Sequence, residues 1–473
     1  MRIQWLGAAG TVTGSRTLLR FENELHLIDC GLFQGPKEIR ERNWNPFPVK
    51  ASDIKSITLT HAHLDHSGFI PRLHKEGFRG PVHCSEGTAD LCKVLWMDSA
   101  KLQEEDADYA NRTGHSKHKP AEALYRSKDV IAALKLLEPH KEDEDWCLTK
   151  NIGVQLRNAG HIVGANFIEM NVSTGQKTWN LCFSGDLGHD RSLTLRGPET
   201  PKKADFLVLE STYGDRLHSG NHSSKKLAHE IERTCSKGGV LLIPSFAVGR
   251  AQEILYMIRQ LEDRGSIKKY PVILDSPMAL KATDLYLKHS LDHQLRKDFE
   301  KIDRENFFPT LYESSESPDD SFGACMREGP MIVISAAGML SGGRILHHLK
   351  SRLPVEKNTV LFVGYQGMGT KGRFLLENGK SYGSLRVHHK EVPVQAHITA
   401  MDDLSAHGDQ KDLLNFVEAM GRGLDTVVLN HGEAESSRNL QIKIAQKFPK
   451  LKCLIADEEL KITINEHSIS DQA

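Results

Sequence analysis

In Thr60-His61-Ala62-His63-Leu64-Asp65-His66-Ser67-Gly68, three imidazoles and one carboxylate lie within six positions. The residues just before it, 56–60, have the length and composition of a short strand. His61 and His63 are two positions apart, so both can point the same way from an extended segment, and the chain then turns towards a helix. Imidazole nitrogen and carboxylate oxygen together suit zinc, and iron or manganese less uniquely. The stretch therefore predicts a metal site; the alternative is a His-rich surface loop.

Three more polar residues stand at the ends of apolar strands, beside a glycine turn. They are His161 after Asn158-Ala159-Gly160, Asp186 before Leu187-Gly188, and His431 before Gly432-Glu433. A single His or Asp at a strand end is usually a capping or surface residue. The shared pattern of strand, polar residue and glycine turn makes these three candidates for completing a site with two metals.

The composition is that of a globular protein with more than one domain. Its 473 residues suggest two or three units, and 39% hydrophobic with 26% charged residues allow more than one sizeable core. The 61 Lys and Arg residues balance 62 Asp and Glu residues, so the chain carries no global positive field. This weighs against a histone-like or coating protein, although a small basic patch suffices to hold a few phosphates.

The cysteines and the apolar segments indicate an intracellular address. Eight cysteines are spread singly without any C-x-x-C, which predicts neither a disulfide framework nor a structural zinc ribbon. The amino terminus moves straight into strand-like sequence without an apolar signal core, and no apolar run approaches the length of a membrane span. We therefore expect a cytoplasmic protein that makes no use of a membrane.

The order of predicted elements indicates one α/β domain interrupted by another. The first part consists of short strands and glycine-rich turns, with helical patterns at about 68–76 and 87–110. From about Gly214, buried-type apolar strands such as 239–244 alternate with helical segments, which is typical of a parallel sheet. Past His397 the chain returns to short strands, and no long linker or repeat separates the parts.

Seven elements, taken in order, resemble the motifs of a known superfamily. Asp29, the H-x-H-x-D-H run of residues 61–66, His161 and Asp186 are similar to the motifs of the metallo-β-lactamase superfamily. Later motifs resemble those of its β-CASP branch, whose members include ribonuclease J and the nuclease subunit of the mRNA 3′-end cleavage complex. These are Glu210 in Leu209-Glu210-Ser211-Thr212-Tyr213-Gly214, His407 in Leu404-Ser405-Ala406-His407-Gly408-Asp409, and His431 before Gly432-Glu433.

The resemblance covers nearly the whole chain and implies an architecture. It implies an α/β fold, in which a metallo-β-lactamase αββα sandwich holds an inserted parallel-sheet β-CASP domain. The sandwich would combine residues 1–210 and 395–473, and the β-CASP domain would comprise residues 211–394. This agrees with the interrupted organisation read from the pattern of elements.

The resemblance also implies a role for each motif residue. The first of two zinc ions per chain would be held by His61, His63 and His161, and the second by Asp65, His66 and His431. Asp186 would bridge the ions, and Asp29 would orient a ligand from behind. The residues placed in the reaction itself are Asp186, Asp65, His407 and Glu210. His407 would act as the acid, and Glu210 would hold it and favour its charged form.

The inserted domain is expected to contribute groups that bind the substrate. Residues 244–250 follow a strand and open a helix, a favourable place for an anion because free N–H groups point outward there. The glycine-rich segments 335–339 and 364–373 look like family loops around phosphates, although a solvated loop is the alternative for the second. The candidate substrate-binding residues are Ser245, Arg250, Ser335, Gly338, Lys371 and Arg373.

The expected function is hydrolysis of RNA phosphodiester bonds, leaving 5′-phosphate and 3′-hydroxyl ends. His431 favours RNA over DNA, because the DNA-processing members of the branch generally lack this histidine. An inserted domain of this size weighs against a lactamase or thioesterase, and the intact ligand set weighs against a silent scaffold. The compact chain favours endonuclease activity on single-stranded RNA, with 5′–3′ exonuclease activity or a DNA substrate as alternatives. By analogy, a homodimer is also plausible.

Overall fold

The computed structural model describes residues 1–114, 119–175, 177–218, 223–293, 295, 304–367, 369–388, 390–401 and 404–472. The chain divides into two compact units. Unit 1 comprises Met1–Arg191, Arg196–Leu217 and His407–Ala473, and unit 2 comprises Ser192–Leu195 and His218–Ala406. The main boundaries between the two units thus lie after Leu217 and before His407. The domain boundaries at 210 and 394 stay predictions.

Unit 1 contains two sheets within the described residues. The first sheet has the order β23 (Ile469–Gln472), β22 (Lys461–Ile464), β1 (Arg2–Gly7), β2 (Arg16–Phe21), β3 (Glu24–Ile28), β4 (Ile54–Thr58), β5 (Val82–Ser85) and β6 (Leu137–His140). The second has the order β21 (Lys452–Ile455), β20 (Thr426–Asn430), β11 (Phe206–Glu210), β10 (Lys177–Phe183), β9 (Asn166–Thr174), β8 (Ile152–Asn158) and β7 (Asp145–Thr149). Both ends of the chain join the first sheet, since β1 pairs with β22.

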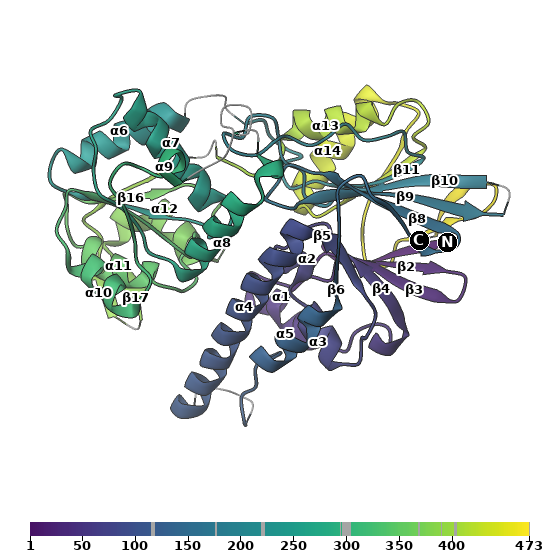
Figure 1. The fold of residues 1–473 in the computed structure, drawn as a ribbon, viewed down its shortest axis with the longest axis horizontal. Coiled ribbons are helices and arrows are strands. Elements are labelled where there is room, and N and C mark those ends of the chain that lie inside the picture. Colours follow the sequence, from purple (N-terminus) through teal and green to yellow (C-terminus); the bar gives the residue numbers. More distant parts are fainter. Residues whose placement is uncertain are drawn as a thin grey trace. The chain divides into compact units, whose positions relative to one another are not determined.

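The two sheets pack face to face, with helices on their outer sides (Figure 1). Alternating side chains of both sheets, among them Trp5, Phe183 and Phe206, form one buried apolar core. Two helices cover the second sheet, namely α13 (Gln410–Ala419) and α14 (Ala434–Lys447). Five lie on the side of the first sheet, namely α1 (Lys37–Glu41), α2 (Leu64–Ser67), α3 (Ile70–Lys75), α4 (Glu86–Thr113) and α5 (Ser127–Ala133).

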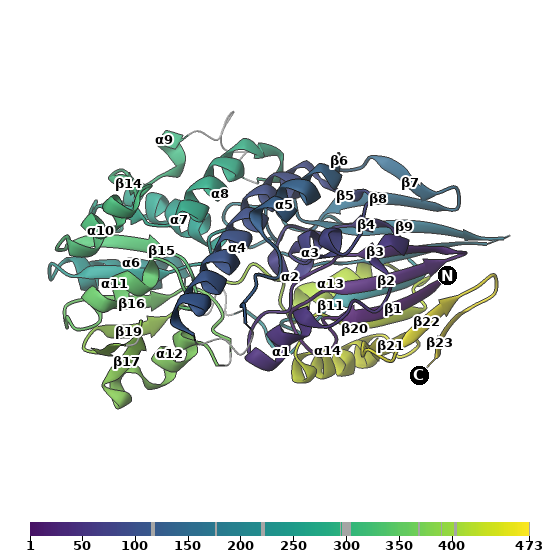
Figure 2. The ribbon, with the colours of Figure 1, turned by 90° about the horizontal axis from the view of Figure 1, so that it is seen from below.

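Unit 2 is built on a parallel sheet flanked by helices (Figure 2). Its strand order is β14 (Tyr312–Ser314), β13 (Val272–Leu274), β15 (Met331–Ser335), β12 (Val240–Pro244), β16 (Thr359–Phe362) and β19 (His397–Ala400), and a hairpin of β17 (Ser384–Val387) and β18 (Lys390–Pro393) lies beside it. The helices are α6 (Ser223–Cys235), α7 (Arg250–Asp263), α8 (Pro277–Lys288), α9 (Arg304–Phe307), α10 (Pro318–Met326), α11 (Ile345–Arg352) and α12 (Lys371–Tyr382). Strands such as β12 are buried along their whole length, as expected for a parallel sheet covered on both faces.

Two local features differ from the sequence-based expectation. The helical segment expected at 68–76 is α3, and a separate short helix that was not predicted, α2, lies before it within the histidine run. Strands β6 and β7 were not predicted, because β6 contains a proline and β7 carries exposed polar residues. Across the described residues, no helix combines the length and apolar character needed to cross a membrane.

Candidate metal centre

The predicted ligands lie at one edge of unit 1, because the strands that precede them point the same way. Strands β8 and β10 both run antiparallel to β9, and β10 runs parallel to β11, which runs parallel to β20. The carboxyl ends of these strands therefore meet at one edge of the second sheet. His161 follows β8, Asp186 follows β10, Glu210 ends β11 and His431 follows β20. The histidine run follows β4 of the other sheet.

The first cluster contains His61, His63, His161 and Asp186, whose ligand atoms all lie within 4.8 Å of one another. Nδ1 of His63 lies 3.0 Å from Nε2 of His61 and 3.2 Å from Nε2 of His161. Oδ2 of Asp186 lies 3.6 Å from Nε2 of His61 and 3.5 Å from Nε2 of His161. Atoms around a tetrahedral ion with bonds of about 2.1 Å are about 3.4 Å apart, so the spacing fits one ion.

The second cluster contains Asp65, His66 and His431. Nε2 of His431 lies 3.1 Å from Nε2 of His66 and 3.4 Å from Oδ2 of Asp65. Asp186 reaches this cluster with its other oxygen, since Oδ1 lies 3.2 Å from Nε2 of His66 and 3.4 Å from Nδ1 of His431. The two oxygens of one carboxylate thus face two separate groups of ligand atoms.

Two observations test whether these residues fit bound metal. Asp186 is 2% exposed, yet its Oδ1 has no hydrogen-bond partner among the described residues. A buried carboxylate oxygen that accepts no hydrogen bond is rare in folded proteins, and a cation between this oxygen and the facing rings of His66 and His431 would satisfy it. Burial lowers the pKa of His61 and His63, which favours the neutral rings that ligands need, whereas Asp186 and Asp29 outweigh burial at His66 and raise its pKa well above the usual value, so an ion there would displace a proton. The donor set therefore fits metal.

Asp29 and Thr60 hold the ligand rings from behind. Oδ2 of Asp29 accepts a hydrogen bond from Nδ1 of His66 at 2.7 Å, which leaves Nε2 of that ring for the centre. The hydroxyl of Thr60 donates to Asp29 at 2.9 Å and lies 3.1 Å from Nδ1 of His61. Sequence reasoning assigned Thr60 no role, and its only signal is its place directly before the first histidine.

Gly31 is a second residue that the motif analysis passed over. A Cβ at this position would lie 1.6 Å from the carbonyl oxygen of Asp65, so only glycine fits. The neighbouring Cys30 donates its backbone N–H to the carbonyl of His66 at 2.7 Å. The segment after Asp29 therefore packs directly against the backbone of the histidine run and fixes its path.

We expect Asp29→Asn to weaken metal binding by about 10- to 100-fold, the usual cost of losing a partner that orients a ligand. The amide keeps the shape of the side chain but removes the charge that holds Nδ1–H of His66. Titration with a competing chelator measures the affinity. Asp53→Asn changes an exposed carboxylate directly before β4. It is the matched control and should leave the affinity unchanged.

His407 and Glu210 form a pair beside the first cluster. Nδ1 of His407 lies 3.1 Å from both carboxylate oxygens of Glu210, and Oε1 of Glu210 also accepts the backbone N–H of Leu187 at 2.6 Å. Nε2 of His407 lies 3.9 Å from Oδ2 of Asp186. Burial lowers the pKa of His407, but the carboxylates of Glu210 and Asp186 raise it further, to about 9. The two carboxylates therefore favour the protonated ring, which can give up a proton.

The loop that carries His407 is held at both ends within unit 1. Gly408 donates its backbone N–H to the carbonyl of Leu187 at 2.7 Å. Asp409 caps helix α13 by accepting from the backbone N–H groups of Lys411 and Asp412, and it pairs with Arg191 at 3.3 Å. These contacts fix His407 relative to the strand ends that carry the clusters.

The six substrate-binding candidates all lie in unit 2, at three places. Ser245, Ser335 and Gly338 meet at the carboxyl ends of β12 and β15, where ligands commonly bind to parallel sheets. The side chains of Ser245 and Ser335 are buried and donate to backbone carbonyls. Arg250 is also buried and pairs with Glu253. Lys371 and Arg373 are exposed in the first turn of α12, and a role for any of the six in binding stays a prediction.

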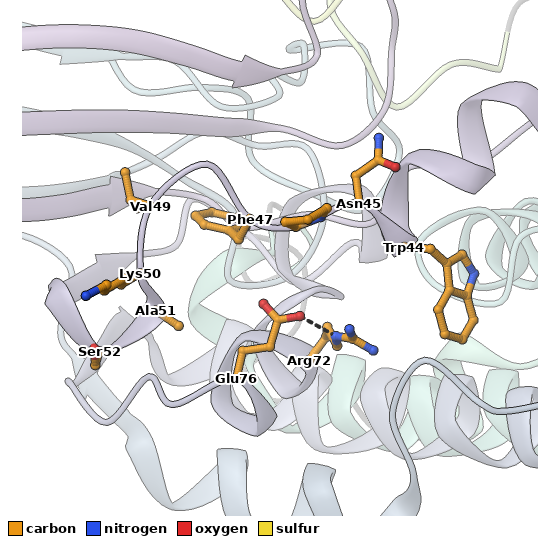
Figure 3. A pocket seen from close by; sticks show the side chains of 10 residues that line it. Trp44, Asn45, Phe47, Val49, Lys50, Ala51, Ser52, Arg72 and Glu76 are labelled. Carbon is orange, nitrogen blue, oxygen red and sulfur yellow. Dashed lines mark hydrogen bonds and ion pairs between the residues drawn. The ribbon is translucent and has the colours of Figure 1, made fainter.

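A surface pocket of about 550 Å³ also lies on unit 1 (Figure 3). It is lined by Trp44, Asn45, Pro46, Phe47, Val49, Lys50, Ala51, Ser52, Arg72 and Glu76. The one carboxylate in the lining, Glu76, accepts a hydrogen bond from Arg72 at 2.6 Å. The lining contains no His or Cys, so the pocket offers no cluster of metal ligands, and the chemistry of unit 1 rests on the histidine clusters.

Comparison with protein families gives three matches along the chain. The family model of the metallo-beta-lactamase superfamily matches residues 10–230. The model of the Beta-Casp domain matches residues 251–375. The model of the Zn-dependent metallo-hydrolase RNA specificity domain matches residues 391–456, which include His407 and His431.

Individual relatives match over most of the chain. A ribonuclease of Thermus thermophilus is 36% identical over 438 residues, covering 92% of this chain and 94% of the relative. Transcription termination factor FttA of Methanocaldococcus jannaschii is 27% identical over 466 residues, covering 95% of this chain and 70% of that one. A solved structure of a protein of unknown function from Enterococcus faecalis has a TM-score of 0.54 and 13% identity, covering 98% of this chain and 99% of that one, and shows the fold alone.

Proposed function

Since the chain belongs to the β-CASP ribonuclease family of the metallo-β-lactamase superfamily, and is thus a metal-dependent nuclease, we propose that it cuts RNA internally with two zinc ions. The products would be a 5′-phosphate and a 3′-hydroxyl. The observation that carries the proposal is Asp186, whose two oxygens face two groups of ligands. RNA as substrate is supported by the Thermus relative, which is named a ribonuclease, and by the match to an RNA specificity domain around His407 and His431.

The ligands divide between the ions as their clusters do. His61, His63 and His161 would hold one ion, Asp65, His66 and His431 the other, and Asp186 would contact both. When bound, such a pair supplies Lewis-acid activation of water and neutralises charge on the phosphate. Without cations, the carboxylates of Asp65 and Asp186 would repel a phosphodiester, so metal loading is a condition for binding the reacting group.

The remaining residues handle the proton that the leaving group needs. His407 would protonate the leaving 3′ oxygen from Nε2, because its Nδ1 is engaged by Glu210. Glu210, fully buried and fixed by the N–H of Leu187, would act as a positioning residue that keeps His407 charged. His407 would thus supply the proton for the leaving group, while the ions would supply the activated water.

The proposal is tested by measuring zinc and cleavage on the same preparation. We expect about two zinc ions bound at the histidine clusters, and internal cuts in RNA labelled at either end but not in DNA of matching sequence. His63→Ala should abolish cleavage, and exposed His467→Ala should not. Release of single nucleotides from the 5′ end would show that the enzyme is an exonuclease and not an endonuclease. Bound zinc with turnover of a small ester or lactam, and of neither polymer, would overturn the function.

Lys371 and Arg373 offer the test of RNA contact in unit 2. If each neutralises one phosphate, Lys371→Ala with Arg373→Ala lowers the slope of log affinity against log salt by about 1.4, at about 0.7 per contact with a single strand. Filter binding at several salt concentrations measures the slope. Lys268→Ala with Lys269→Ala removes the same charge from another exposed part of unit 2 and is the matched control. An unchanged slope in the first variant rejects phosphate contact.

The cysteines support a cytoplasmic location. All eight are unpaired, and six of them are buried. Unpaired cysteines are typical of proteins from reducing compartments. We also propose that the RNA is cut in its single-stranded form and that the protein assembles as a homodimer. Both points rest on family resemblance.

A further inference from the structure

A second group of metal-ligand types lies on the first sheet of unit 1, apart from the residues of the nuclease centre. Strands β5 and β6 are parallel neighbours, and their register places His83 opposite Glu138. Glu138 and His140 are two residues apart on β6, so both side chains leave the same face of the strand. The register therefore brings two imidazoles and one carboxylate to one face of the sheet.

The ligand atoms of the three side chains converge. Nδ1 of His83 lies 3.0 Å from Nε2 of His140 and 3.6 Å from Oε2 of Glu138. Four contacts among His61, His63, His161 and Asp186 likewise measure 3.0 to 3.6 Å, and the ligand atoms of each group all lie within 4.8 Å of one another. These contacts are close to the spacing of about 3.4 Å between atoms that share a tetrahedral ion.

We propose that His83, Glu138 and His140 form a further binding site for a divalent transition-metal ion, of which Zn²⁺ is the best match. Two imidazole nitrogens and one carboxylate oxygen are a ligand set that zinc takes, leaving one position for water. The side chain of His83 is 10% exposed and that of Glu138 is 60% exposed, so the site opens to solvent on the carboxylate side. None of the three belongs to the nuclease clusters, and the site does not depend on the proposed function.

A neighbouring ring prepares one of the two imidazoles for this role. The ring of His140 stacks on Trp146 of β7, with ring centres 4.0 Å apart and planes at 12°, which fixes its orientation. A ligand ring that is already held in place needs less rearrangement when an ion binds.

Two residues next to the group carry unsatisfied polar atoms. Thr58 lies opposite His83 in the pairing of β4 with β5, and its buried hydroxyl has no hydrogen-bond partner among the described residues. The same is true of Nε1 of Trp146, whose ring stacks on His140. Polar atoms are seldom left this way in a core, so this region has room for further polar partners such as ordered water.

An ion at this site would act on the structure of the sandwich. Strand β6 is the edge of the first sheet, and β7, which carries Trp146, is the edge of the second. The ion would tie β6 to β5, and the stacked Trp146 would extend the connection to β7. The competing explanation is an N–H···N hydrogen bond between the two imidazoles, with no metal involved.

The experiment counts ions in the full chain after removal of metal and titration with Zn²⁺. We expect wild type to bind one ion more than His140→Gln, and both to cleave RNA at rates that agree within about twofold. Glu138→Gln removes an exposed ligand and leaves both rings, and it should lose the same ion. It tests the site independently if His140→Gln folds poorly. His467→Gln, an exposed histidine elsewhere, should bind as many ions as wild type.

A variant that lacks ligands in both nuclease clusters isolates the site. His61→Ala, His66→Ala and Asp186→Ala together leave only two ligands in each cluster and should retain one ion, and adding His140→Gln should remove it. A free zinc concentration about a hundredfold above Kd should raise the melting temperature of the triple variant by about 5 °C. Equal ion counts in wild type, His140→Gln and Glu138→Gln, with no thermal shift in the triple variant, would leave only a hydrogen-bonded pair and overturn the proposal.

Discussion

Asp186→Ala is expected to bind at least one zinc ion fewer than wild type and to cleave RNA at least about 10⁴-fold more slowly. The carboxylate is the only group whose oxygens face both clusters among the described residues, at 3.2 and 3.4 Å on one side and 3.5 and 3.6 Å on the other. Its removal takes a ligand from each ion at once. Loss of several kcal/mol of charge stabilisation, at about 1.4 kcal/mol per tenfold change in rate, gives this magnitude.

Single-turnover cleavage and elemental analysis of the same sample measure both effects. Asp190→Ala, an exposed acid four residues away, should leave both quantities unchanged. Asp186→Asn keeps the volume and one acceptor oxygen, so it separates the loss of the bridging charge from the loss of packing. An ion count equal to that of wild type and more than about one percent of the activity in Asp186→Ala would show that the two clusters do not share this carboxylate.

Much of the fold could be predicted from the sequence, because its strongest signals are local. Apolar runs such as β12 and β15 lie between helical patterns, and they form the predicted parallel sheet of unit 2. The ordered motifs predicted a metallo-β-lactamase sandwich with an inserted β-CASP domain, and the family matches confirm that fold. Edge strands β6 and β7 escaped prediction, since an edge needs little apolar pattern and is defined by its neighbour.

The candidate ligands could be predicted as residues, but their arrangement could not. His161, Asp186 and His431 could be predicted because a polar residue beside a glycine turn at the end of a strand is a local pattern. The contact of Gly31 with the backbone of Asp65 depends on packing between segments, and no local pattern encodes it. His83 and His140 are 57 residues apart and meet only through the register of β5 and β6.

His348 shows the same limit in unit 2. His348 lies on α11, next to His347. The ring of His348 is fully buried, and its Nε2 lies 2.6 Å from Oδ2 of Asp275, which follows β13. Unlike the run at residues 61–66, a histidine within a helix has no local pattern that tells whether it packs in the core or holds a metal, and only its buried partners decide.

His407→Ala is expected to keep both zinc ions and to lose cleavage by about two to four orders of magnitude, the usual contribution of a general acid. Its Nδ1 is held by Glu210, and no role as a ligand is needed if His61, His63, His161 and Asp186 complete the first site. An RNA with sulfur in place of the leaving 3′ oxygen tests the role directly. A thiolate leaves without a proton, so the loss caused by His407→Ala should shrink on that substrate.

Glu210→Gln is the companion variant, because it keeps a hydrogen-bond acceptor beside Nδ1 and removes the charge. Glu210 raises the pKa of His407, so in this variant the acid loses its proton at a lower pH. The pH above which cleavage falls should therefore move downward, an effect that a purely structural role would not produce. Asp186, Glu210 and His407 also lie close enough to share an ion. A missing zinc ion in His407→Ala would therefore make this histidine a ligand and reject it as the acid.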